Sequence, residues 1–335
     1  DKVETKKLIG DLIQLDQYIG ELYSINYESA NIQVNDFHRQ KVGGIPSLSF
    51  LIATRMIHGV DDINFKDEDS SILLLRVMDA ANLPNSSEAE RIRVESGQKV
   101  SGEPNKHWDR EAMDPHTKNY LNYAGVKCRV IGTFFIERED ESNPESKLHL
   151  RFGCDLSNYY PNRGLKVYKP NAKALQLIVN YTEPANNTHE VKVRLGEIRY
   201  ASTNRQFQGV SNVPVYINPN DLLAQKSALF GMTRTGKSNT TKIILQSVYD
   251  LRFQTNSEKP LRIGQIVFDP NGEYANENTQ DQGGGLAPTA IKNVWENKGV
   301  KKDDEVVTYG ILPHINDPDR KFMLLNFFLD DNIQI

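Results

Sequence analysis

Residues 231–238 have the types and spacing of a phosphate-binding loop. They read Gly-Met-Thr-Arg-Thr-Gly-Lys-Ser and match the pattern G-x-x-x-x-G-K-[ST] in full. In such a loop the glycines let the backbone wrap closely around phosphate oxygens, and successive N–H groups point inward as donors. Lys237 would reach the β- and γ-phosphates of ATP, and the Ser238 hydroxyl would ligate Mg²⁺. The residues predicted to contact the nucleotide are Gly231, Thr233, Arg234, Thr235, Gly236, Lys237, Ser238 and Asn239.

Two acidic residues follow the next apolar stretch of the chain. Residues 262–268 predict a buried strand that ends at Asp269, and Glu273 comes four residues later. Ligands of open α/β sheets lie outside the carboxyl ends of the strands, so both carboxylates would be near the phosphates. Glu273 would orient or deprotonate the attacking water, and Asp269 is a candidate metal ligand. The alternative is that Asp269 caps the Pro-Asn-Gly turn at 270–272 and that Glu273 faces solvent.

A strand, a helix and a second strand would position these residues. The apolar residues 227–230 predict the first strand, and 237–251 predict a helix with Ile243, Ile244 and Val248 toward the sheet. Together with the strand predicted at 262–268, this succession is typical of a βαβ unit. Before it, the sequence predicts an extended segment and a turn that leads into a short helix. Residues 206–335 are therefore predicted to form an α/β domain.

The part of the chain before this domain, residues 1–205, has the pattern of an all-β domain. Short apolar, β-rich runs recur between turn signals, which indicates a barrel or a sandwich. The runs predicted as strands are 32–34, 49–53, 72–77, 127–136, 148–152, 174–179 and 190–195. Two polar stretches, 82–114 and 140–147, are expected to be insertions that form solvated loops or short helices.

Composition excludes several classes of protein. The 335 residues carry a formal charge of −4, which argues against a generic nucleic-acid coat but leaves room for a local basic channel. The two cysteines provide no disulfide framework and lack the spacing of a metal site. The mean hydropathy is −0.55, and neither a membrane span nor a signal peptide is recognisable. We therefore expect a cytoplasmic protein with no membrane contact.

Residues 230–240 and 267–274 together resemble the HerA/FtsK-type P-loop ATPases, and HerA most closely. Residues 215–223 are similar to the HerA approach to its loop. Residues 43–54 are similar to the small N-terminal β-barrel of HerA proteins. The resemblance implies a small β-barrel followed by a RecA-like P-loop ATPase domain.

The resemblance also implies an activity and partners. HerA-type ATPases form homohexameric rings that hydrolyse ATP and move double-stranded DNA through a central pore. They work with an effector such as a NurA-like nuclease, and similar bacterial proteins pair with sirtuin-type subunits in anti-phage defence. A rival hypothesis is a nucleotide-binding ring scaffold that assembles and activates a partner effector with little translocation.

Two departures from the family pattern affect the predicted site. Arg234 lies where relatives usually carry a small residue, and it would reach phosphates or a neighbouring subunit, or else point into solvent. After Tyr274 no apolar strand ends in an acidic pair, and residues 322–329 have the spacing of a buried helix. We therefore expect the third-strand acidic pair, the sensor and the arginine finger to lie outside these 335 residues.

Overall fold

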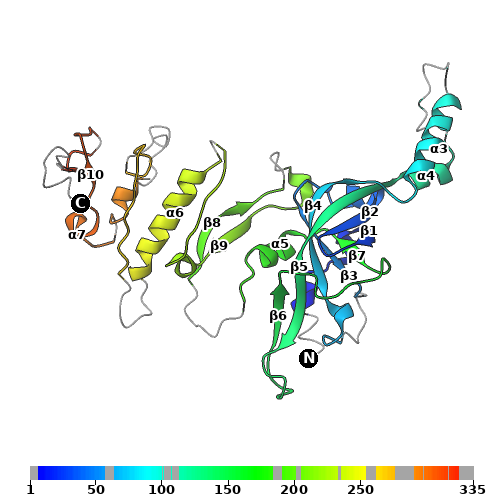
Figure 1. Cartoon of the computed structure of the whole chain (residues 1–335), viewed down its shortest axis with the longest axis horizontal. Helices are drawn as coiled ribbons and strands as arrows, with labels where there is room; N and C mark the ends of the chain where they lie inside the picture. The colour runs from blue at the N-terminus through cyan, green and yellow to red at the C-terminus, as the bar shows by residue number, and fades with distance from the viewer. Residues whose placement is uncertain are drawn as a thin grey trace, which may run out of the picture. The chain divides into compact units, whose positions relative to one another are not determined.

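The computed structural model of the chain describes residues 7–56, 64–99, 101, 107, 113–183, 191–200, 205–232, 235–253, 262–275, 290–296, 298–315 and 317–323. The chain forms two compact units. The first comprises Asp1–Thr188 and Gly196–Val215, and the second comprises His189–Leu195 and Tyr216–Ile335. The strands β1 to β7 belong to the first unit, and the long helix α6 belongs to the second (Figure 1).

Six antiparallel strands of the first unit close into a barrel (Figure 1). Their order around the barrel is β1-β7-β3-β4-β5-β2, and β2 closes the ring by pairing with both β1 and β5. A further strand, β6, continues the sheet beyond β5. This architecture confirms the predicted small β-barrel. The strands are β1 (Tyr18–Ile25), β2 (Ser29–Asn35), β3 (Phe50–Thr54), β4 (Ile72–Ala81), β5 (Tyr123–Arg138), β6 (Leu148–Gly153) and β7 (Lys166–Tyr168).

The central strands of the barrel wall are buried on both faces. Leu51 and Ala53 of β3 belong to an apolar cluster with members from all six barrel strands, which is the barrel interior. Ile52, between them, points outward into a second cluster that includes Leu12 and Ile178. Neighbouring residues of a strand point to opposite faces, so a wall covered on both sides is apolar at every position. This explains why β3 lacks a regular apolar/polar alternation, whereas β2, which has a regular pattern of buried and half-buried residues, keeps it.

One of the predicted strands is a helix. Residues 174–179 belong to α5 (Ala172–Val179), so the strand prediction there is wrong. Asn171 caps this helix, because its side chain accepts a hydrogen bond from the backbone N–H of Ala174. Ala174 and Ile178, four residues apart, are both buried, as the helical repeat requires. The β-branched residues favoured a strand, but packing of one helical face on the protein decided the outcome.

The two predicted insertions are a helical excursion and a turn. The stretch 82–114 contains α3 (Ser86–Lys99), and α4 (Pro115–Leu121) follows before β5. The two helices are joined by a side-chain hydrogen bond and project beyond the barrel between the end of β4 and the start of β5 (Figure 1). The stretch 140–147 connects β5 to β6 without regular structure. The stretch 140–147 thus has the predicted form of a loop. In the stretch 82–114 the helix α3 is 14 residues long, which is longer than the short helix predicted, and residues 100, 102–106 and 108–112 lie outside the described residues.

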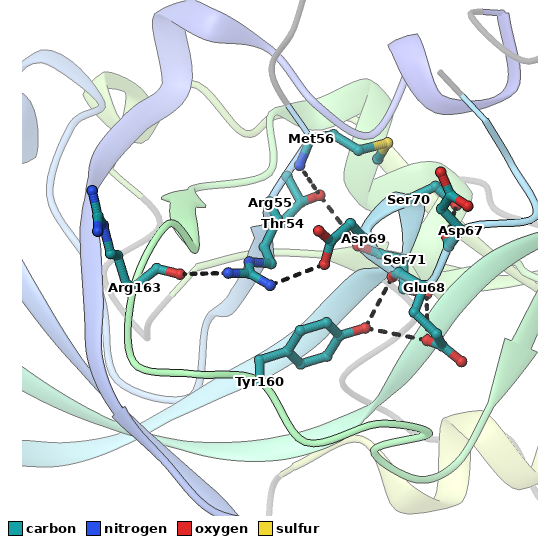
Figure 2. A network of polar contacts seen from close by, with 10 residues as sticks. All are labelled: Thr54, Arg55, Met56, Asp67, Glu68, Asp69, Ser70, Ser71, Tyr160 and Arg163. Atoms are coloured by element: carbon teal, nitrogen blue, oxygen red, sulfur yellow. Dashed lines mark hydrogen bonds and ion pairs between the residues drawn. The ribbon is translucent and has the colours of Figure 1, made fainter. Parts of the chain in front are cut away.

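A polar network beside the end of β3 ties together three segments of the first unit (Figure 2). Arg55, directly after β3, donates to the Asp69 carboxylate at 3.0 Å and to the carbonyl oxygen of Arg163 at 3.3 Å. The Tyr160 hydroxyl donates to the carbonyl oxygen of Glu68 at 3.0 Å. Because the Asp69 side chain is 65% exposed, its ion pair contributes at most about 1 kcal/mol. The network therefore holds the loop after β6 in place, and we assign it a structural role.

In the second unit the main element is α6 (Lys237–Asp250), which confirms the helix predicted at 237–251. This unit also contains β10 (Tyr309–Gly310), which pairs in parallel with β11 (Lys321–Phe322). Strands β8 (Val193–Ile198) and β9 (Val213–Ile217) pair with each other, and each has residues of both units. None of the helices in the described ranges is long and apolar enough to cross a membrane. The remaining elements are α2 (Asp36–Lys41), α7 (Lys302–Glu305) and the 3₁₀ helices η1 (Leu15–Gln17), η2 (Glu68–Ser70), η3 (Gln206–Gln208), η4 (Pro219–Leu222), η5 (Leu251–Phe253) and η7 (Ile291–Asn293).

A buried lysine holds the segment before β9 against the barrel. Lys169 is 1% exposed, and its Nζ donates to the carbonyl oxygens of Val42 at 2.7 Å and Gln208 at 3.4 Å. The ammonium also lies 5.1 Å from the centre of the Tyr200 ring. Gly43, next to Val42, also faces the segment before β9. Its φ is +74°, and a Cβ at this position would lie 2.0 Å from the carbonyl oxygen of Phe207. Burial lowers the pKa of Lys169 to about 8.

This burial predicts a pH-dependent stability that Lys169→Met should remove. The folded pKa lies below the unfolded value of 10.5, so the unfolded state binds more protons between these values and stability rises with pH. The neutral amine still has two N–H groups for the two carbonyls. We expect the free energy of unfolding to rise by roughly 2 kcal/mol between pH 7 and 9.5 relative to the variant. Denaturant unfolding of both proteins measures this, and parallel pH curves would refute it.

Candidate nucleotide-binding site

The glycine-rich loop leads directly into α6, as predicted (Figure 1). Gly236 precedes the helix with φ of +85°, a left-handed conformation that glycine adopts without strain. At Gly231 a Cβ would lie 2.7 Å from the Thr235 hydroxyl, so a larger residue there would have to displace the Thr235 side chain. The Thr235 hydroxyl donates to the carbonyl oxygen of Met232 at 2.7 Å, which folds the loop back on itself. The predicted contacts Thr233 and Arg234 lie outside the described residues.

Lys237 spans the loop from the first turn of α6. Its Nζ donates to the carbonyl oxygens of Gly231 at 2.7 Å and Met232 at 2.5 Å. The helix has no side-chain cap at its N-terminus, so its first amides and its dipole are available to an anion. A phosphate at this point would meet the ammonium, the helix end and the backbone of the loop together. Asn239, also predicted to contact the nucleotide, is exposed on the same first turn.

The structure brings Glu273 to the predicted metal ligand Ser238. The Ser238 hydroxyl donates to Glu273 Oε2 at 2.6 Å, although the two residues are 35 positions apart. Asp269 has a different environment. Its Oδ1 accepts from the backbone N–H of Glu273, and its Oδ2 accepts from those of Tyr274 and Ala275, all at 2.9 Å. Asp269 therefore has the contacts of the turn cap considered in the sequence, and its role as a metal ligand stays a prediction.

The segment that carries both carboxylates runs antiparallel to α6. Its beginning is held where Gln265 Nε2 donates to the carbonyl oxygen of Leu245 at 3.0 Å, and its end is held by the contact of Glu273 with Ser238 near the start of the helix. This direction is the one that the strand after a helix takes in a βαβ unit. The course of the chain thus explains why a pair of residues distant in sequence meets at the phosphate loop.

The two strands predicted around α6 are not formed in the structure. Residues 227–230 and 262–268 have no strand partner within the described ranges. Their large apolar side chains are exposed, with Phe230 at 91%, Ile266 at 86% and Phe268 at 88%. A strand is defined by ladder hydrogen bonds to a neighbour, and an apolar segment without one does not become a strand. Of the residues predicted on the sheet-facing side of α6, Val248 is buried and the two isoleucines are half-buried.

The far end of α6 is anchored by charged residues that the sequence did not single out. Arg252 forms an ion pair with Glu305 at 2.5 Å, and the two side chains are only 14% and 6% exposed. The Arg252 guanidinium also lies 4.5 Å from the centre of the Phe253 ring. The hydrogen bond from Arg252 lowers the pKa of the Glu305 carboxyl. These contacts join segments about fifty residues apart, so no local pattern could have revealed them.

The loop, its lysine and serine, and the helix that follows them define a P-loop nucleotide-binding protein. Residues 193–306 match the family model described as the central domain of helicase HerA. The match covers about a third of the chain, from β8 to the end of α7, and includes every predicted site residue. It confirms the resemblance for this region, which is a HerA-type P-loop ATPase domain. A comparison with curated proteins finds no match.

The residues present suit ATP with Mg²⁺. In the described ranges no group of three His, Cys, Asp or Glu side chains is placed to hold a metal ion. Mg²⁺ in P-loop proteins does not require such a group, because one hydroxyl, the phosphates and water supply its ligands. The Ser238 hydroxyl is next to the ammonium of Lys237 in sequence and next to the Glu273 carboxylate in space. This set of donors fits a nucleotide whose metal is held mainly by its own phosphates.

Proposed function

We propose that the protein is an ATP-dependent DNA translocase or helicase-like motor of the HerA type that works as a homohexameric ring. The observation that carries this proposal is the contact of Glu273 with Ser238 at the start of α6, inside the region that matches the HerA central domain. A carboxylate at this point can accept a proton from the water that attacks the γ-phosphate, which is a step of hydrolysis. The proposal includes a RecA-like core for this region.

Each site residue has a separate task in hydrolysis. Lys237 binds and neutralises the β- and γ-phosphate oxygens, and the uncapped end of α6 adds its dipole. Ser238 would hold Mg²⁺ through its hydroxyl, and bound Mg²⁺ would supply further neutralisation of phosphate charge. Glu273 accepts a proton from the attacking water or orients it, which requires its carboxylate to leave Ser238 for that water.

The partners proposed here are those that the resemblance to HerA-type ATPases implies. Duplex DNA would be the track of the ring, held through phosphates by a few basic residues in each subunit. The effector would be a NurA-like nuclease or a sirtuin-type subunit, with anti-phage defence in the cytoplasm as the proposed setting. The helices α3 and α4, which project beyond the barrel, offer a contact surface for such a second protein (Figure 1).

The same projecting helices and the formal charge of −4 favour a second candidate. In this version the protein is a nucleotide-binding ring scaffold that assembles and activates its effector with little translocation. An acidic protein has weak general attraction for DNA, whereas a helical excursion is well suited to protein contact.

ATP hydrolysis by the intact protein, with and without duplex DNA, separates the two candidates. A motor should show DNA-stimulated turnover, and its DNA affinity should fall steeply as salt rises because phosphate contacts release counterions. Single-stranded DNA of the same length is the control for the duplex. A scaffold should bind ATP without stimulation and bind little DNA at any salt concentration. A protein that neither binds nor hydrolyses ATP would contradict both candidates.

A further inference from the structure

Asp269 has an unusually complete set of backbone partners for a residue beside a nucleotide site. Three consecutive amides, those of residues 273–275, converge on its two oxygens at 2.9 Å. Hydrogen bonds to an ionised carboxylate are stronger than neutral ones, and three of them fix the backbone of a short segment. Gly272, with φ of +72°, provides the reversal that aims these amides back at Asp269.

The segment fixed in this way includes the residue that meets the phosphate loop. Asp269 Oδ1 holds the N–H of Glu273, and the Glu273 side chain then reaches the Ser238 hydroxyl at 2.6 Å. Both Asn271 and Glu273 are exposed, so side-chain packing alone does not hold this turn. Two other backbone hydrogen bonds hold this turn, from the N–H of Gly272 to the Asp269 carbonyl oxygen at 3.3 Å and from the N–H of Ile291 to the Tyr274 carbonyl oxygen at 2.8 Å. Neither of them engages the amide of Glu273, which the Asp269 carboxylate holds.

The same contacts argue against direct metal ligation by Asp269. Both of its oxygens already face the positive ends of N–H dipoles. A divalent cation on these oxygens would lie close to three N–H hydrogens that repel it, or would have to break their hydrogen bonds. Ser238 has no such conflict, because its hydroxyl engages a carboxylate that a metal can displace.

We propose that Asp269 is a positioning residue, which holds the backbone of residues 273–275 so that Glu273 faces Ser238, and that it does not ligate the metal. This inference rests on the proposed ATPase function. In this proposal Asp269 affects hydrolysis only by positioning Glu273. Ser238 has a different role, because its hydroxyl would bind the metal.

The first test measures the turn itself in the nucleotide-free protein. Asp269→Asn keeps the size of the side chain but replaces one of its two acceptor oxygens with an N–H₂ donor. We expect faster hydrogen exchange across residues 273–275, by about tenfold, with the amides of α6 unchanged. Unaltered exchange in residues 273–275 would overturn the proposal whether or not the protein hydrolyses ATP.

The second test compares the Mg²⁺ dependence of ATP turnover in Asp269→Asn and Ser238→Ala. For Asp269→Asn we expect kcat to fall by about 10- to 100-fold, which is the usual effect of removing a residue that orients a functional group. The Mg²⁺ concentration that gives the half-maximal rate should be unchanged. Ser238→Ala should need more Mg²⁺. A higher Mg²⁺ requirement in Asp269→Asn would show that it is a ligand and would overturn the proposal, as would an unchanged kcat.

Two further variants complete the comparison. Asp140→Asn removes a similar turn cap in the barrel, where Asp140 accepts from the N–H of Ser142 at 2.9 Å, and it should leave kcat unchanged. Asp269→Asn combined with Glu273→Gln should be no slower than Glu273→Gln alone, because both changes act through one group. Fully additive losses would contradict the proposal. Absence of ATP turnover in the unmodified protein would instead mean that the proposed function fails, and the exchange measurement would still decide the role of Asp269.

Discussion

Lys237→Ala should reduce kcat/KM for ATP by about 100- to 1,000-fold, which is the usual cost of removing one preorganised charge partner from a reacting group. Lys237 Nζ donates hydrogen bonds to the carbonyl oxygens of Gly231 and Met232, where the glycine-rich loop meets the N-terminus of α6. Alanine is a good helix former, so the first turn of α6 should persist in the variant. The loss would therefore come from the missing ammonium and not from unfolding of the site.

Steady-state hydrolysis and the binding of a fluorescent ADP analogue measure this prediction. Lys242→Ala, a lysine-to-alanine change five residues further along the same helix, is the matched control and should retain full turnover. Circular dichroism of the three proteins checks that the fold is preserved. Turnover by Lys237→Ala at the rate of the unmodified protein would reject the assignment of this loop as the ATP site.

The second large effect is expected for Glu273→Gln, which should lower kcat by about 100-fold or more while nucleotide binding changes little. Glutamine can still accept a hydrogen bond from the Ser238 hydroxyl, so it preserves the contact seen at 2.6 Å. It carries no negative charge and cannot take a proton from water. The effect should therefore appear in the chemical step rather than in affinity.

This prediction is measured by single-turnover hydrolysis alongside the dissociation constant of the nucleotide. Glu141→Gln, on the exposed loop between β5 and β6, makes the same chemical change away from the site and should have no effect. If Glu273→Gln hydrolyses ATP at the normal rate, Glu273 does not assist the attacking water. If it loses nucleotide affinity instead, the role of Glu273 lies in binding and not in hydrolysis.

Local sequence was a good guide where an element depends mainly on its own residues. The helix α6 follows from two glycines before an apolar-periodic segment, and most barrel strands follow from short β-rich runs between turns. Two barrel strands were not predicted. β7 is only three residues long, and β1 contains Gly20 and departs from regular register with both of its neighbours. Such strands exist because the barrel must close, which is a property of the whole sheet.

The strand predictions failed where a partner decided the structure. Residues 174–179 contain β-branched side chains that suit a strand, yet they form a helix because one helical face packs on the barrel wall. Residues 262–268 are apolar enough for a buried strand, yet most of their apolar side chains are exposed and no strand in the described part of the chain pairs with them. In both segments the intrinsic preference was weaker than the presence or absence of a tertiary contact.

The phosphate loop, its lysine and serine, and the helix that follows them could be predicted from the sequence, because residues adjacent along the chain set all of these features. The sequence also placed Asp269 and Glu273 near the site but left open which of them acts and which caps the turn. The fold distinguishes their surroundings, because it joins Glu273 to Ser238 and surrounds Asp269 with backbone amides. The physical reason is that hydrogen-bond partners distant in the chain are selected by the fold, and no local spacing encodes them.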